Sequence, residues 1–95
     1  MLVKYTRLAE AAYLEAVSYL RERNPSAARD FVLEVRKREE QLLAFPLSGS
    51  YVPEFPTSVY KQVFVKPYRF FYRVEDDTVW IVAIYYERQI PAAPN

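Results

Sequence analysis

The sequence predicts an α+β domain in which an N-terminal strand leads into a two-helix hairpin. The hairpin packs on one face of a small antiparallel sheet that ends in a three-stranded meander. Apolar residues recur at helical spacing in the first half of the chain, whereas aromatic and β-branched residues alternate after Ser58. The 95 residues, 52% of them apolar and 17% aromatic, suffice for one hydrophobic core and not for two. We therefore expect a single globular domain over residues 1–95.

The N-terminal half begins with a short apolar strand, Leu2–Tyr5, and continues into a helix from Arg7 to Arg23. Thr6 is the predicted N-cap, because its hydroxyl can accept a backbone N–H of the first turn. The buried stripe of this helix consists of Leu8, Ala12, Ala16 and Leu20, with Tyr13 and Val17 beside it. Asn24-Pro25 ends the helix, because a proline disfavours the α conformation in the residue before it.

A second helix begins at Pro25-Ser26, since proline is well tolerated in a first turn. Its apolar stripe consists of Ala28, Phe31, Val32, Val35, Leu42 and Leu43. Residues 36–40 interrupt this stripe, and we interpret them as a solvated segment with intrahelical ion pairs. The helix ends over residues 45–49, and the tight link between the two helices makes them a helical hairpin.

A proline-rich loop runs from the second helix to about Ser58. Gly49, the only glycine, lies in this loop, where a positive φ is most expected. Three strands follow at Val59–Lys66, Tyr68–Val74 and Val79–Tyr86, with turns at residues 66–67 and 75–78. The pattern does not decide where the N-terminal strand joins this sheet.

Composition excludes several kinds of site. The chain has no cysteine, and hence neither a disulfide nor a cysteine-based metal site, and it has no histidine, the commonest general base. We expect no cofactor and no metal. The net charge of +1 neither favours nor excludes a nucleic-acid partner. No apolar run is long enough to span a membrane and no signal peptide is visible, so a cytoplasmic protein without a membrane partner is expected.

Basic residues stand at fixed parity in the predicted meander. Strand side chains alternate between the two faces of a sheet. Tyr68, Phe70, Tyr72 and Val74 form the predicted core face, and Arg69, Phe71 and Arg73 form the other. Lys61 lies on the preceding strand, and Arg88 has the parity of Trp80, Val82, Ile84 and Tyr86. Such cations suit an anion or a phosphoryl transition state, while the alternative is an ordinary charged face or a guarded strand edge.

Two further groups are candidates for chemistry. Glu54, in the proline-rich loop, would act as a general base if it lay near the arginines, and is otherwise a plain loop residue. Tyr85, Tyr86, Tyr68 and Tyr72 suit base stacking, but half-buried core tyrosines with a hydrogen-bonded hydroxyl are the commoner case. Trp80 is expected to be a packing residue.

These residues, in this order, resemble the RelE/ParE toxin superfamily of bacterial type II toxin–antitoxin modules, which includes plasmid stabilisation proteins. The resemblance covers nearly the whole chain. It rests on Asn24-Pro25, Ala27-Ala28-x-x-Phe31, Leu43-x-x-Pro46-x-x-Gly49, Val52-Pro53-Glu54, Pro67-Tyr68-Arg69-Phe70-Phe71-Tyr72-Arg73-Val74, Val79-x-Ile81-x-x-Ile84 and Arg88.

The resemblance implies a growth-inhibiting toxin that a cognate antitoxin wraps and neutralises. It also implies one of two targets. RelE-like members cleave mRNA on the ribosome without a metal, whereas ParE-like members inhibit DNA gyrase and are not nucleases. In the nuclease alternative Arg69 would bind the scissile phosphate, Arg88 or Lys61 would stabilise the transition state, and Glu54 or a tyrosine would act as the base.

The sequence departs from the nuclease pattern at several positions. Val63 occupies the place of a second lysine, Tyr86 stands where many members have a histidine, and no aromatic residue follows Arg88. These departures, together with the long helical hairpin, favour the ParE-like alternative. A toxin fold that has lost its toxicity and only binds an antitoxin is the third hypothesis.

The antitoxin or the target is expected to bind at Arg69, Phe71, Arg73, Tyr86 and Arg88. A groove between the hairpin and the sheet, close to the arginines, is the expected seat for an acidic amphipathic segment. The sequence does not indicate the oligomeric state.

Overall fold

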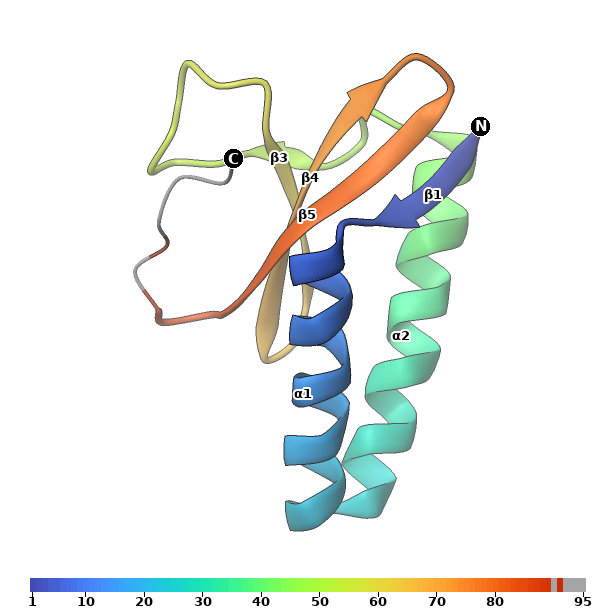
Figure 1. The fold of residues 1–95 in the computed structure, drawn as a ribbon, viewed down its shortest axis with the longest axis vertical. Helices are drawn as coiled ribbons and strands as arrows, with labels where there is room; N and C mark the ends of the chain where they lie inside the picture. Colours follow the sequence, from blue (N-terminus) through green and yellow to red (C-terminus); the bar gives the residue numbers. More distant parts are fainter. Residues whose placement is uncertain (90, 92–95) are drawn as a thin grey trace.

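The computed structural model describes residues 1–89 and 91, and within them it confirms the predicted α+β class (Figure 1). Two helices pack on one face of a five-stranded sheet with the strand order β1-β5-β4-β3-β2. The elements are β1 (Leu2–Tyr5), α1 (Arg7–Arg23), α2 (Pro25–Ala44), β2 (Ser50–Tyr51), β3 (Lys61–Val65), β4 (Tyr68–Glu75) and β5 (Thr78–Tyr86). Neither helix in these residues combines the length and the apolar character that crossing a bilayer requires.

The sheet is antiparallel except at one edge, where β1 runs parallel to β5. Its four residues pair only with the first part of β5, from Leu2 opposite Thr78 to Tyr5 opposite Ile81. The chain then turns away into α1. Among the described residues, the last part of β5, from Ala83 to Tyr86, therefore has β4 on one side and no strand on the other.

The helix boundaries follow the predicted caps. Thr6 Oγ1 accepts the backbone N–H of Ala9 at 3.2 Å, as predicted for the N-cap of α1. Asn24 serves both helices: its N–H donates to the Leu20 carbonyl at the end of α1, and its Oδ1 accepts from the first turn of α2. One residue therefore satisfies the ends of both helices and makes the hairpin tight.

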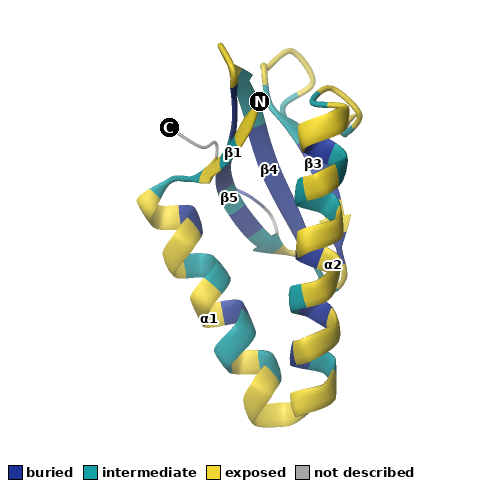
Figure 2. Cartoon of the chain, turned by 90° about the vertical axis from the view of Figure 1, so that its right-hand side faces the viewer, coloured by how far each residue is buried: buried dark blue, intermediate teal, exposed yellow. Residues whose placement is uncertain are grey.

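The main core lies between the hairpin and the sheet, where the buried positions of both layers face each other (Figure 2). Phe31 of α2 is central to it, with ring centroids of Tyr13, Tyr68 and Phe70 at 6.1, 5.5 and 6.2 Å. The predicted core face of β4 is confirmed, because its members Tyr68, Phe70, Tyr72 and Val74 all belong to this cluster.

Two details of the strands differ from prediction. The two-residue strand β2 lies inside the segment that was expected to be loop, where it pairs with the start of β3. A bulge in β5 leaves Val82 without a partner, since Phe71 pairs with Ala83 and Tyr72 with Ile81. The extra residue reverses the parity, so the expectation that Val82 and Ile84 share a face is wrong.

Gly49 does not adopt a positive φ, so the expected reason for a glycine at this position is wrong. The cause is instead a close approach: a Cβ at this position would lie 2.6 Å from both the Gln62 carbonyl oxygen and the Tyr72 hydroxyl. The Gly49 N–H donates to that hydroxyl at 2.9 Å, which holds the loop after α2 against the sheet.

We predict that Gly49→Ala destabilises the protein by about 1–3 kcal/mol, because the methyl group overpacks a contact made by backbone and a buried ring. Thermal unfolding followed by circular dichroism should show a melting temperature lower by roughly 5–15 °C. Ser50→Ala, one residue further at an exposed site, is the matched control and should melt like the parent chain. An unchanged melting temperature for Gly49→Ala would contradict the close approach.

Candidate functional site

The second face of the sheet is covered around Arg69 and Phe71, so the expectation that Arg69 lies on an open, anion-receiving face is wrong. Residues 52–60 fold back over it, and Arg69 and Phe71 retain only 6% and 0% of their exposure. The cluster beneath this segment consists of Val52, Phe71 and Val82, with Phe55, Tyr60, Trp80, Ala83 and Tyr85 packed against it. The apolar side chains of the segment exclude the solvent that an anion site would need.

Arg69 fastens this covering segment to the sheet. Its Nη1 and Nη2 donate to the two carboxylate oxygens of Glu54 at 3.0 and 2.7 Å, and its Nε donates to Gln62 Oε1 at 2.9 Å. The guanidinium carbon also lies 5.0 Å from the centroid of the Phe71 ring. A bidentate pair of this kind is both strong and geometrically specific. The three side chains are called the Arg69 clasp below: Arg69, Glu54 and Gln62.

The clasp changes the chemistry expected of Glu54. The hydrogen bond from Arg69 lowers the pKa of the Glu54 carboxyl below its ordinary value. Such a carboxylate stays ionised at neutral pH and is a weak proton acceptor. We expected Glu54 to act as a general base if it lay near the arginines. It does lie beside Arg69, but the two side chains form an ion pair.

The other basic candidates lie apart from the clasp. Lys61 pairs with Tyr72, whose ring is in the helix-side core, so its side chain lies on the opposite face of the sheet from Arg69. Its Nζ is 3.5 Å from the Gly49 carbonyl oxygen. Arg73 forms an ion pair with Glu75 at 3.4 Å, and Arg88 is exposed in the turn after β5. Of the four predicted catalytic residues, only Arg69 and Glu54 are in contact.

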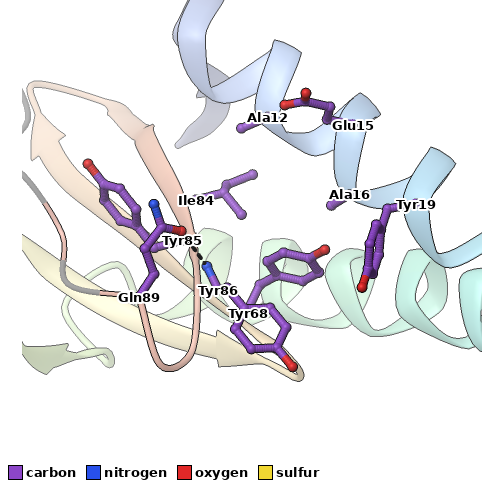
Figure 3. Close-up of a pocket in the computed structure, with 9 residues that line it drawn as sticks. All are labelled: Ala12, Glu15, Ala16, Tyr19, Tyr68, Ile84, Tyr85, Tyr86 and Gln89. Atoms are coloured by element: carbon purple, nitrogen blue, oxygen red, sulfur yellow. Dashed lines mark hydrogen bonds between the residues drawn. The ribbon is translucent and has the colours of Figure 1, made fainter.

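A groove of about 600 Å³ lies on the helix side of the sheet, between α1 and the end of β5 (Figure 3). Ala12 and Ala16 provide the room on α1, because their side chains are small. The complete lining is Ala12, Glu15, Ala16, Tyr19, Tyr68, Ile84, Tyr85, Tyr86 and Gln89. This groove is called the α1–β5 groove. It is the predicted hollow between the hairpin and the sheet, but neither Arg69 nor Arg73 lines it.

Tyrosines give the α1–β5 groove its character. The Tyr68 and Tyr86 rings meet edge to face at 5.8 Å, and burial raises the pKa of the Tyr68 hydroxyl above its ordinary value. Tyr19 is 46% exposed, and the Arg23 guanidinium carbon stacks 3.6 Å from its ring centroid. The groove thus offers aromatic surface with one cation near its rim, which suits a peptide more than a phosphate.

The sequence analysis identified part of this groove, because Tyr68 and Tyr86 were candidates. It missed Tyr19, although the sequence contains a signal for it. Tyr19 follows Ala12 by seven residues and Ala16 by three, so the three residues lie on one face of the helix. Of the five residues expected to bind a partner, only Tyr86 lines the groove, while Arg69 and Phe71 are buried under residues 52–60.

The comparisons with known proteins agree with this architecture. The family model described as "ParE toxin of type II toxin-antitoxin system, parDE" matches residues 3–91. A solved structure described as "Chromosomal ParDE TA system from P. aeruginosa" is similar in fold, with a TM-score of 0.67 and 19% sequence identity. The match covers 90% of this chain and 95% of that chain. No functionally curated protein matches the sequence significantly.

We predict that the Arg69 clasp makes the stability of the folded protein depend on pH in the acidic range. Since the folded-state pKa of Glu54 is lowered, its contribution is present above the unfolded-state pKa of about 4.3 and is lost as the pH falls through the folded-state value. The melting temperatures of the parent chain and Glu54→Gln should therefore differ most at neutral pH and converge as the pH falls below about 4. Glu87→Gln, at an exposed site after β5, controls for a lost surface charge. A difference that does not change with pH would contradict the ionised clasp.

Proposed function

Because the chain belongs to the family of ParE toxins of type II toxin–antitoxin systems, we propose that it arrests growth by inhibiting DNA gyrase and that its antitoxin neutralises it by occupying the α1–β5 groove. Membership of the family makes the chain the toxin component of a two-protein module and implies a cognate antitoxin as its partner. The choice of gyrase and the seat of the antitoxin rest on the arrangement of residues described above.

The environment of Arg69 carries the choice of gyrase over the ribosome. A ribonuclease of the RelE kind would need Arg69 free to bind the scissile phosphate, but its guanidinium already donates to Glu54 and Gln62. Phosphate would have to displace a bidentate carboxylate and also enter a face covered by residues 52–60. This cost favours a toxin that acts by binding a protein.

The position of Lys61 supports the same conclusion. Transition-state stabilisation requires cations that converge on one group. The sheet itself separates the Lys61 side chain from Arg69, because the two residues lie on opposite faces. The sequence-based nuclease set is therefore not assembled in the described residues.

Two neighbouring features make the α1–β5 groove a suitable seat for an antitoxin segment. The edge of Ala83–Tyr86 has no strand beside it, so an extended segment can pair with its backbone groups other than the Tyr86 N–H, which donates to Gln89 Oε1 at 3.2 Å. The groove beside this edge accepts apolar side chains. A flexible segment that uses both would bury on the order of 2,000 Å² in total. Most of its affinity would come from the aromatic surface rather than from the arginines of β4.

We predict that the purified protein inhibits supercoiling of relaxed plasmid by the gyrase of its own host. Expression without the antitoxin should arrest growth and induce the DNA-damage response, and primer extension on translated mRNA should show no new cleavage. Lys61→Ala should keep its toxicity within about twofold, since its side chain makes one long hydrogen bond, to the Gly49 carbonyl, and lies on the opposite sheet face from Arg69. Cleavage in the ribosomal A site that Lys61→Ala abolishes would establish the nuclease alternative instead. Harmless expression in the native host, with active gyrase and intact mRNA, would indicate a toxin fold without toxicity.

We also predict that Tyr19→Ala weakens binding of the antitoxin, the product of the adjacent gene, by about tenfold or more. The ring is half exposed and lies in the groove, so its loss should remove contact area without unfolding the domain. Isothermal titration calorimetry with both purified proteins measures this change, and thermal melting of the free toxin checks the fold. Leu47→Ala, which removes a more exposed apolar side chain outside the groove, is the control. Equal losses for the two variants would place the antitoxin elsewhere.

A further inference from the structure

Glu15 gives the α1–β5 groove a negative charge. Among the described residues that line the groove, it is the only one with an ionised side chain at neutral pH. Glu15 is exposed, and within residues 1–89 and 91 it forms no ion pair that would compensate its charge. A second groove, of about 470 Å³ between α1 and α2, has the opposite charge, because it is lined by Arg21, Arg29 and Arg36 and by no acidic residue.

Three tyrosines line the α1–β5 groove together with Glu15: Tyr19 on α1, Tyr68 on β4 and Tyr86 on β5 (Figure 3). The Tyr68 and Tyr86 rings meet edge to face at an interplanar angle of 89°. Burial is the main cause of the raised pKa of the Tyr68 hydroxyl, and Tyr19, Tyr86 and Glu15 raise this pKa further. All three side chains therefore lie within electrostatic range of one hydroxyl at the groove.

The tyrosine rings add to the attraction that the groove exerts on positive charge. The face of an aromatic ring carries partial negative charge and attracts cations. Such a contact exists at the rim, where the Arg23 guanidinium carbon lies 3.6 Å from the Tyr19 ring centroid. Arg23 does not line the groove, and neither does any other basic residue that the structure describes. Several aromatic rings beside a carboxylate are the combination that recognises an organic cation.

We infer that the α1–β5 groove binds a lysine or arginine side chain of the antitoxin segment, with the cation held between the tyrosine rings and the Glu15 carboxylate. This inference rests on the proposed function, in which that segment pairs with the edge of Ala83–Tyr86. Strand side chains alternate between two faces, so the basic residue must occupy a position that faces the same side as Ile84 and Tyr86. Opposite residues on paired strands have Cβ atoms only about 4.5–5.5 Å apart, a distance that a long basic side chain spans easily.

Charge distinguishes this occupant from the others that the groove can accept. Glu15 and the ring faces would repel an acidic side chain, so the acidic segment expected from the sequence does not suit this position. An aliphatic side chain would fill the hollow but would gain nothing from the carboxylate. A second copy of the chain would bring Glu15 against Glu15, because a two-fold interface presents one patch to itself.

A double-mutant cycle tests the inference by isothermal titration calorimetry with the full-length toxin and the full-length product of the adjacent gene. Glu15→Gln removes the charge and keeps the size of the side chain, and it should weaken antitoxin binding by about tenfold. Each lysine and arginine of the antitoxin is replaced in turn by methionine. One of these replacements should weaken binding to the parent toxin by a similar factor, and should have much less effect on binding to Glu15→Gln.

Variants of Tyr19 test the contribution of the rings. Tyr19→Phe keeps the aromatic face and should bind the antitoxin within about twofold of the parent chain, whereas Tyr19→Leu is apolar without a ring and should bind about five- to tenfold more weakly. Glu22→Gln, seven residues after Glu15 on α1 and outside the groove, controls for the loss of one surface charge. All of these side chains are exposed, so the variants should melt like the parent chain.

The inference is wrong if Glu15→Gln shows no coupling to any basic residue of the antitoxin, or if Tyr19→Leu binds as tightly as Tyr19→Phe. In either case a loss of affinity for Tyr19→Ala would still place the antitoxin in the groove, and the proposed function would stand. No loss for Tyr19→Ala would instead remove the proposed seat, and the inference with it.

Two further results would assign the groove to a different occupant and would also overturn the inference. Displacement of the antitoxin by millimolar spermidine would indicate a site for a free amine. A toxin dimer in analytical ultracentrifugation that Tyr19→Ala dissociates would indicate a second copy of the chain.

Discussion

The ion pair between Arg69 and Glu54 is the interaction on which the arrangement of this protein depends. A guanidinium with 6% exposure is costly unless its charge is matched and its donors are used. Glu54 and Gln62 provide that match from two different segments, the proline-rich loop and β3. Through this contact a segment of irregular structure covers the part of the second sheet face around Phe71 and Val82, and Phe71 and Val52 become fully buried.

Because β5 is buried on both faces, it must direct apolar side chains in an order that a regular strand cannot provide. Val79, Ile81 and Ile84 must face the helices, while Val82 must face the covering loop. Alternation alone cannot place Ile81 and Ile84 on one face, because they are three positions apart, which is an odd number. The bulge at Val82 provides the extra residue, and it also directs Ile84 and Tyr86 into the α1–β5 groove.

With Arg69 and Phe71 covered on the second face, the helices and the edge of β5 offer the binding surfaces described above. The first helix contributes to both grooves with different residues: Ala12, Ala16 and Tyr19 face the end of β5, and Val17 and Arg21 face α2. One surface is aromatic and lies beside a strand edge that has no neighbouring strand, and the other is aliphatic with three arginines. Ala16 of this helix also belongs to the main core, and Ala12 and Val17 pack against it, so the same helix serves both the core and the two surfaces.

The sequence by itself determined the elements and their class. Periodicity located both helices and the three-stranded meander, Thr6 and Asn24-Pro25 marked the helix ends, and strand parity assigned Phe70 and Tyr72 to the core. Each of these depends on local geometry, which neighbouring residues decide. The pattern also provided the resemblance to the RelE/ParE superfamily, which the family match over residues 3–91 confirms.

The tertiary structure alone decided which surfaces are open. Parity places Arg69 on the second face but cannot show that a distant loop covers that face, since Glu54 meets Arg69 only after the chain has folded. No glycine or other distinctive residue in the sequence of β5 indicates the bulge at Val82. Gly49 is needed because β3 and β4 approach it closely, and not because of its own φ. The parallel β1–β5 pairing likewise joins opposite ends of the chain. All of these are long-range contacts, and a local sequence pattern does not show which distant residues meet.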